Sequence, residues 1–132
     1  MARSRQVGCS SAEARTRLQH AKLYLEVAEL VLSESGSEAT VATGNAVLAG
    51  IAAADALCCA LAARRYRGAD HREAADFLGD VSGNKALAKA LGDLIDLKDQ
   101  AHYGIDNVRL RRAGTAIRRA KVLVDAAERE VG

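Results

Sequence analysis

The stretch AVLAGIAAADALCCALAA, residues 46–63, decides the fold of this chain. Nine of its residues are alanine, and its one charged residue is Asp55. A stretch that is apolar nearly all round is typical of a helix enclosed by other helices. A membrane span is the alternative, but alanine is weakly apolar and an aspartate near the middle of a membrane is costly. We therefore predict the buried central helix of a bundle and expect no membrane association.

Further helices are predicted on both sides of this central helix, which we expect to run from about Glu38 to Tyr66. Before it, Ser10 or Ser11 can cap a helix whose apolar residues recur every three or four positions: Ala14, Leu18, Ala21, Leu25, Ala28 and Leu32. After it, turn residues separate helices over about residues 70–78, 85–103 and 107–129. The pattern predicts an all-α protein, an up-and-down four-helix bundle with one additional short helix and no strands. We expect one domain over residues 11–132 and a flexible tail over residues 1–10.

The bulk composition excludes some functions. The formal net charge of the 132 residues is +2, which is too small to indicate nucleic-acid binding by itself. The three cysteines are Cys9, Cys58 and Cys59, and neighbouring cysteines on a helix point about 100° apart, so they make a poor bridge or metal pair. An odd number without a ligand spacing indicates reduced thiols in a cytoplasmic protein. We expect no metal and no cofactor.

The segment RRYRGADHREAADFL, residues 64–78, has two interpretations. In the first it is a helix boundary: Arg64, Arg65 and Arg67 lie in the last turn of the central helix, Gly68 ends it, and a capping box starts the next helix at Asp70 and Glu73. In the second, Arg65 and His71 form an Arg-x5-His pair that could cleave RNA without metal. The histidine would take the proton of the ribose 2′-hydroxyl, and the arginine would hold the phosphate oxygens.

The segment LGDLIDLKDQAHYG, residues 91–104, carries a second group of polar residues. Helical periodicity places Lys98 and His102 near the centre of its inward stripe, one turn apart. Buried cations need partners, and Asp55 is the candidate partner in the central helix. The pair could be a polar layer that fixes helix register, or a catalytic or ligand-binding pair. Alternatively, the histidine is half exposed near the helix end and the lysine extends outward to solvent. Tyr103 is expected to pack at the end of the bundle with its hydroxyl in reach of water.

The last predicted helix is basic. It has no acidic residue between Asp106 and Asp125, and its cations are Arg109, Arg111, Arg112, Arg118, Arg119 and Lys121. These residues could form an ordinary solvated face. Alternatively, Arg111, Arg112 and Arg118 could bind phosphate groups of RNA or a nucleotide, or an acidic partner. If the helix ends converge, this surface would extend to the arginines at 15, 17, 64, 65 and 67.

Three segments taken together resemble a known family: RRYRGADHREAADFL after the central helix, LKDQAHYG, and AGTAIRRAKVLVDAAERE in the last helix. Over about residues 11–130 the chain is similar to HEPN-type domains, the higher eukaryotes and prokaryotes nucleotide-binding family. The resemblance implies a bundle of four to five helices, usually a homodimer. Active members are metal-independent ribonucleases with an Arg-x4–6-His motif in a composite site across the dimer. Other members are binding modules, often beside a small nucleotidyltransferase in a toxin–antitoxin pair.

This chain departs from the active pattern, because the corresponding place has Lys98 and His102 with only three residues between them. Lysine offers a point charge where arginine offers a two-pronged fork. Our leading hypothesis is therefore a non-enzymatic HEPN-like module, a homodimer that binds a nucleotide, RNA or a protein partner such as a nucleotidyltransferase. The alternatives are a metal-independent endoribonuclease that uses His102 or His71, and a purely structural or regulatory interaction bundle.

Overall fold

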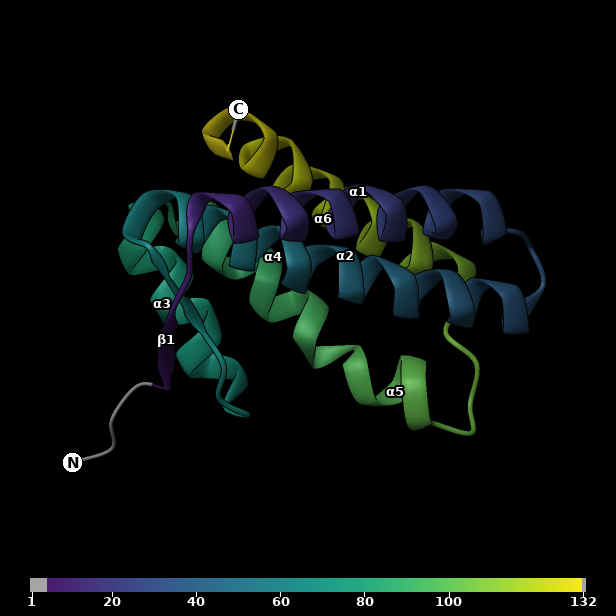
Figure 1. Ribbon diagram of the computed structural model, residues 1–132. Coiled ribbons are helices and arrows are strands. Elements are labelled where there is room, and N and C mark those ends of the chain that lie inside the picture. Colours follow the sequence, from purple (N-terminus) through teal and green to yellow (C-terminus); the bar gives the residue numbers. More distant parts are fainter. Residues whose placement is uncertain (1–4, 132) are drawn as a thin grey trace.

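The protein is an all-α helical bundle, as its sequence predicts (Figure 1). The computed structural model describes residues 5–131, without the side chain of His71. Six helices lie in this described part: α1 (Ser11–Val31), α2 (Gly36–Ala62), α3 (His71–Ser82), α4 (Lys85–Asp96), α5 (Lys98–Tyr103) and α6 (Leu110–Val131). Two short strands accompany them, β1 (Gln6–Gly8) and β2 (Arg64–Tyr66).

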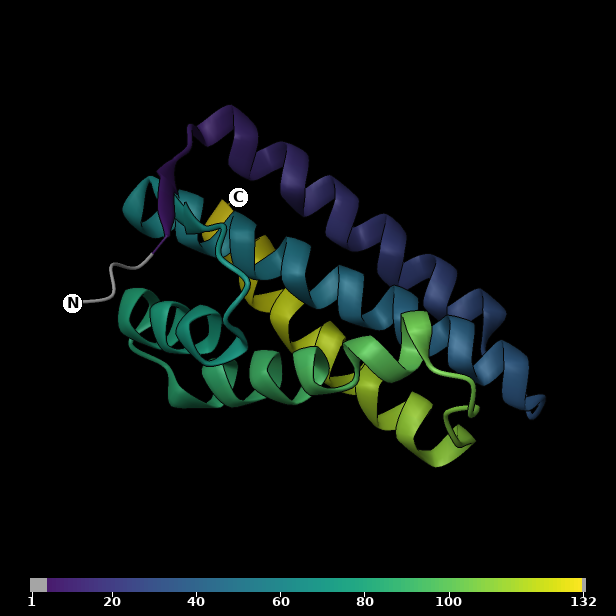
Figure 2. The same ribbon diagram turned by 90° about the horizontal axis from the view of Figure 1, so that it is seen from below.

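Helix α2 is the centre of the bundle and contacts each of the other five helices (Figure 2). Every residue from Ala52 to Cys59 is buried, which confirms the prediction from the alanine-rich stretch. Small residues let the neighbouring helices approach closely. A Cβ atom added at Gly50 would collide with Leu94 of α4 and would lie 3.3 Å from Leu123 of α6. The absence of a side chain at this position therefore sets the spacing of three helices.

Helix α2 is also the one helix in the described part of the chain that is long and apolar enough to cross a membrane. In the structure, 67% of its most apolar window is buried inside the bundle. The core helix of a bundle passes the same test of length and composition.

The first helix begins as its sequence predicts. The Ser10 hydroxyl accepts from the Glu13 amide, and the Glu13 carboxylate accepts from the Ser10 amide, which makes a complete capping box. The predicted stripe packs against α2 and α6, with Ala14, Ala21, Leu25 and Ala28 buried and Leu18 and Leu32 partly buried. The spacing of apolar residues therefore predicts correctly which face of α1 is buried.

The end of the central helix differs from the prediction. Helix α2 ends at Ala62, because Ala63 adopts a left-handed conformation with φ of 54° and turns the chain away. The following residues form β2, which pairs antiparallel with β1, so the expectation of no strands is wrong. Gly68 does not end the helix, and the arginines at 64, 65 and 67 lie beyond its last turn.

The N-terminal segment is held against the bundle. Residues 6–8 form β1, and Cys9 is bonded to Cys59 by a disulfide with a Cα–Cα distance of 5.5 Å. The expected flexible tail is therefore wrong for residues 5–10, while residues 1–4 lie outside the described residues. The expectation of three reduced thiols is also wrong, and only Cys58 is free. The bonded cysteines are 50 residues apart, and their spacing in the sequence does not indicate that they meet.

The predicted fourth helix over residues 85–103 is two helices. Helix α4 ends at Asp96, Leu97 serves as its C-cap, and α5 starts at Lys98 in a different direction (Figure 2). Leu97 is buried, which fixes the chain at the break. Residues after Leu97 therefore do not continue the inward stripe of α4.

Candidate binding pocket

A pocket of about 360 Å³ lies between α2, α3, α4 and the loop that follows β2. One face of α2 forms its floor through Ile51, Ala54, Asp55 and Cys58, which recur at helical spacing. The other walls are mainly apolar. They are formed by Ala74, Phe77 and Leu78 of α3, Leu91 and Ile95 of α4, Tyr66 of β2, and Gly68, Ala69 and Asp70 of the loop. Lys98 completes the lining at the start of α5.

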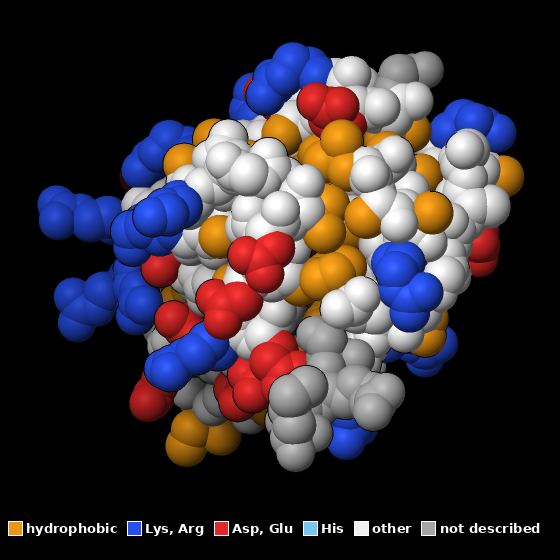
Figure 3. Space-filling model, turned by 90° about the vertical axis from the view of Figure 1, so that its left-hand side faces the viewer, with side chains coloured by type: hydrophobic (Ala, Val, Ile, Leu, Met, Phe, Trp, Pro, Cys, Tyr) orange, Lys and Arg blue, Asp and Glu red, His pale blue; other side chains and the backbone are white. Residues whose placement is uncertain are grey.

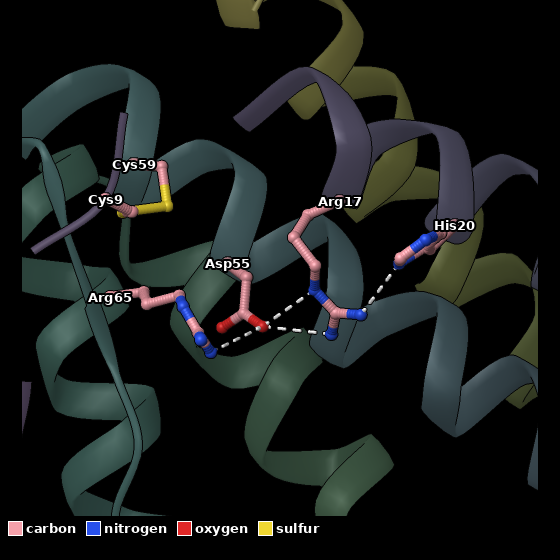
Figure 4. Close-up of polar contacts among 6 residues, drawn as sticks. All are labelled: Cys9, Arg17, His20, Asp55, Cys59 and Arg65. Atoms are coloured by element: carbon pink, nitrogen blue, oxygen red, sulfur yellow. Dashed lines mark hydrogen bonds and ion pairs between the residues drawn. A yellow bond between two sulfur atoms is a disulfide. The ribbon is translucent and has the colours of Figure 1, made fainter. Parts of the chain in front are cut away.

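Asp55 is the buried charge of the pocket, with 9% of its surface exposed (Figure 4). Arg17 of α1 donates to its Oδ2 atom from Nε at 3.0 Å and lies 2.9 Å from the same oxygen through Nη2. Arg65 of β2 approaches Oδ2 from the other side at 3.8 Å. Within the described residues, Oδ1 has no hydrogen-bond partner, so one carboxylate oxygen stays available to a ligand.

Burial raises the pKa of Asp55 above its ordinary range, although Arg17, Arg65 and Arg67 act in the opposite direction. The loss of hydration therefore outweighs the ion pairs, as is common for buried salt bridges. A ligand that donates a hydrogen bond to Oδ1 would supply part of the missing solvation. A ligand that donates a hydrogen bond to Oδ1 would therefore favour the ionised form of Asp55.

The expected partners of Asp55 were Lys98 and His102, and this expectation is wrong. The first turns of α1 lie against the second half of α2. Arg17 of α1 therefore lies close enough to pair with the Asp55 carboxylate, which has no ion pair with a described residue of α5. Arg17 was expected only as a possible part of a phosphate-binding patch, and its pairing with Asp55 was not predicted. Its position directly before Leu18, on the flank of the buried stripe, was the available signal.

Lys98 and His102 are separated by the break at Leu97 from the inward stripe of α4. Lys98 is half-buried and lines the pocket, and it has no ion-pair partner among the described residues. His102 is exposed, with its ring edge 3.2 Å from the place of a Cβ atom at Gly44, so its predicted core position is wrong. Tyr103 is 78% exposed, so its hydroxyl is in reach of water, but its ring does not pack closely on the bundle as expected.

The loop after β2 is shaped by Tyr66. Its hydroxyl accepts from the Asp70 amide at 3.1 Å and donates to the Glu73 carboxylate at 3.3 Å. Asp70 caps α3 by accepting from the amides of Arg72 and Glu73, as predicted. Glu73 does not reach back to the Asp70 amide, because Tyr66 takes that position. The side chain of His71 lies outside the described residues, so the Arg65–His71 pair is not placed by the structure.

Cys58 is a free cysteine whose side chain lines the floor of the pocket. Burial, with a contribution from Asp55, raises the pKa of its thiol to about 12. Only the thiolate is a good nucleophile, so this side chain acts as a small apolar group.

The structure divides the predicted arginines. Arg65 lies beside Asp55, whereas Arg64 is turned away and donates to the side chain and backbone of Gln6. Arg111 and Arg112 line a separate groove between α4 and α6, together with two acidic residues of α4. Arg118 donates to Thr115 on its own helix. The basic final helix and the pocket are therefore separate surfaces.

The charges at one end of the bundle are mixed. Figure 3 looks at the end that carries α3 and β1, and hydrophobic side chains are exposed between basic and acidic groups. A nucleic-acid backbone is best held by a continuous basic surface. The face seen in Figure 3 does not present such a continuous basic surface.

Comparison with known protein families and with curated proteins finds no match for this chain.

Proposed function

We propose that the protein is a non-enzymatic, HEPN-like helical module that binds a nucleotide in the pocket between α2, α3 and α4. The observation that supports this most directly is that Asp55 and Lys98 line the same pocket, whose other walls are mainly apolar. Among the described residues, Oδ1 of Asp55 has no hydrogen-bond partner and the Lys98 ammonium has no ion-pair partner. Its volume of about 360 Å³ is within the usual range for small-molecule pockets. A ligand that fits must combine a flat apolar body, hydrogen-bond donors and a negative charge.

A nucleotide has these three parts. Its base would lie against the apolar walls made by Ile51, Phe77 and Ile95. A base amine or a ribose hydroxyl would donate to Oδ1 of Asp55, which is the kind of polar group that fixes orientation in such pockets. The phosphate would bind Lys98 through charge-assisted hydrogen bonds.

The test is a calorimetric titration of the oxidised protein with AMP, GMP, CMP and UMP at low salt, with the matching nucleosides for comparison. We expect Lys98→Ala to weaken nucleotide binding by about 10- to 150-fold, because a charge-assisted hydrogen bond contributes about 1.5–3 kcal/mol. Lys85→Ala is the matched control, since Lys85 is exposed at the start of α4 and does not line the pocket. If no nucleotide binds at low salt, or if Lys98→Ala and Lys85→Ala behave alike, the proposal fails.

Self-association is part of the proposal. Leu23, Val27 and Leu30 are exposed to 52%, 42% and 78%, and they lie at positions i, i+4 and i+7 on one face of α1. This face is opposite the buried stripe, and an apolar stripe of this kind is suited to a partner helix. We propose a homodimer, and Leu30→Glu should convert it to a monomer in light scattering. Wild-type protein that is monomeric at high concentration would refute this part.

Ribonuclease activity is the second candidate, and one contact favours it. Arg17 Nη1 lies 3.2 Å from His20 Nδ1 in an exposed position (Figure 4). Because a guanidinium only donates, Nδ1 of His20 accepts in this contact and the ring proton lies on Nε2. That N–H would donate a hydrogen bond to a phosphate oxygen beside the Arg17 guanidinium. We expect RNA to remain intact without metal. Cleavage that is lost in His20→Ala, His71→Ala or His102→Ala would replace the binding proposal with the enzymatic one.

A further inference from the structure

The N-terminal segment is fastened to the end of α2 by several bonds. The Cys9–Cys59 disulfide joins the two covalently. Next to it the Cys9 amide donates to the Ala63 carbonyl at 2.9 Å, and the Arg67 amide donates to the Arg5 carbonyl at 2.7 Å. Between these two bonds, β1 pairs with β2 over three residues. Residues 63–67 are therefore held along their whole length by residues 5–9.

The segment that is held in this way forms part of the pocket. Arg65 in β2 approaches the Asp55 carboxylate at 3.8 Å. Tyr66, next in the strand, lines the pocket and fixes the start of α3 through its bonds to Asp70 and Glu73. Strand β1 therefore supports the wall of the pocket indirectly, because it pairs with β2, which carries Tyr66.

The ribbon has little stability of its own. Two paired strands of three residues are too short to be independently stable in water. Their outward surface is largely exposed, and Val7 and Gly8 of β1 are exposed to solvent. We therefore expect the strand pairing by itself to be too weak to keep β1 in place without the covalent bond.

We propose that the Cys9–Cys59 disulfide is a redox-controlled latch on the α2–α3–α4 pocket. With the bond intact, β1 holds β2 and the loop wall of the pocket in position. After reduction, β1 detaches, β2 loses its only strand partner among the described residues, and the wall formed by Tyr66 and the residues that follow it opens. The effect on nucleotide affinity rests on the proposed function, whereas the opening of the wall does not.

The reductant is a small or protein dithiol. Its thiolate attacks one sulfur of the disulfide and releases the other as a thiol, and its second thiol then displaces the mixed disulfide. Two electrons and two protons pass to the protein, Cys9 and Cys59 become thiols, and the dithiol becomes a disulfide. Both bonded cysteines are buried, at 9% and 4% exposure, so the attack follows a transient opening of β1.

Cys58 does not compete for this exchange. It points from α2 into the pocket, about 100° around the helix from its neighbour Cys59. Its thiol is buried and stays protonated. The disulfide between Cys9 and Cys59 is therefore protected from exchange with Cys58. Because Cys58 lines the pocket, its rate of alkylation measures how well the wall shields the pocket from solvent.

The first experiment uses this reporter. Oxidised wild-type protein and the double variant Cys9→Ala/Cys59→Ala each contain a single thiol, Cys58, so their alkylation by iodoacetamide is directly comparable by mass spectrometry. We expect alkylation of the double variant to be faster by about tenfold or more, since the wall no longer shields the thiol. Far-UV circular dichroism checks that both proteins keep their helices. Equal alkylation rates in two folded proteins would overturn the latch.

The second experiment uses wild-type protein and does not depend on the folding of a variant. Hydrogen exchange is measured before and after reduction with tris(carboxyethyl)phosphine. We expect the amides of Cys9 and Arg67 to lose protection while those of residues 52–59 keep it. Simultaneous loss of protection in α2 would mean that reduction unfolds the whole bundle, and unchanged protection of Arg67 would mean that β1 stays in place. Either result overturns the proposal.

Nucleotide titration then separates the two proposals. If the oxidised protein binds a nucleotide, we expect reduction to weaken binding by about tenfold, equivalent to about 1.4 kcal/mol. Equal affinity in both states would overturn control of the ligand site. If neither state binds a nucleotide, the proposed function fails, while faster alkylation of Cys58 and deprotection of Arg67 still support the latch.

Discussion

Breaking the Cys9–Cys59 disulfide should lower the stability of the bundle by an amount that follows from the chain between the cysteines. The bond closes a loop of 50 residues. In the chain-entropy treatment, a loop of this length removes about 14 cal/mol/K from the unfolded chain, or about 4 kcal/mol at 25 °C. Folded domains are stable by about 5–15 kcal/mol in total, so this is a large share.

The same estimate can be expressed as a temperature. Unfolding entropies near 60 °C are about 2.1 cal/mol/K per residue, so a loss of about 4 kcal/mol in this chain lowers the Tm by about 15 °C. Detachment of β1 removes little buried packing, because Cys9 is the one buried residue among residues 5–9. The expected change therefore comes almost entirely from the loop.

Differential scanning calorimetry with and without tris(carboxyethyl)phosphine measures this change. Thiol titration of the denatured protein should give one free thiol before reduction and three after it. Cys9→Ala should melt close to reduced wild-type protein and should not respond to the reductant. Cys58→Ala is the matched control, because it removes a buried cysteine but keeps the bond, and its response to the reductant should equal that of the wild type.

An unchanged Tm at a thiol count of three would refute the reasoning, because the bond would then not restrict the unfolded chain enough to stabilise the folded state. The chain has three cysteines, so complete reduction gives a count of three thiols. The thiol count therefore verifies that the disulfide has been reduced before the Tm is compared.

Three further predictions follow from the core, the pocket and a helix start. Gly50→Ala should cost about 1–3 kcal/mol in chemical denaturation, because a side chain there collides with α4, whereas Gly114→Ala on the open side of α6 should be neutral or stabilising by up to about 1 kcal/mol. Burial raises the pKa of Asp55, so the folded state binds its proton more tightly than the unfolded state. The unfolding free energy of wild type relative to Asp55→Asn should therefore fall as pH rises above about 3.9, and a rise would show that the ion pairs dominate. Asp70→Ala should cost about 1 kcal/mol through loss of the α3 cap, and exposed Asp76→Ala on the same helix should be nearly neutral by thermal unfolding.

The helices themselves follow from local sequence. The alanine-rich stretch predicts a fully enclosed helix, and the residues from Ala52 to Cys59 are all buried. The caps at Ser10 and Asp70 are also local, since each side chain bonds to an amide two or three residues further along. Signals of this kind need only the residues within one or two turns, so they can be interpreted without the fold.

The candidate site could be predicted only in part. Asp55, Arg65 and Lys98 are among the predicted residues and belong to the pocket or its edge. The position of His102 could not be predicted, because helical periodicity holds only within one helix and the chain bends at Leu97. Phe77 and Tyr66 enter the pocket through the packing of α3 and its loop against α2, which no pattern in either segment records.

Sequence alone determined the class of fold, the order of the helices and the face that each long helix buries, because these depend on periodicity and on caps. Tertiary structure decided that Arg17 pairs with Asp55, 38 residues away, and that Cys9 bonds to Cys59 at the end of α2. It also decided that residues 64–66 leave the helix to pair with residues 6–8. Each of these depends on where two distant segments meet, and that position is set by the packing of all the helices around α2, not by the residues that make the contact.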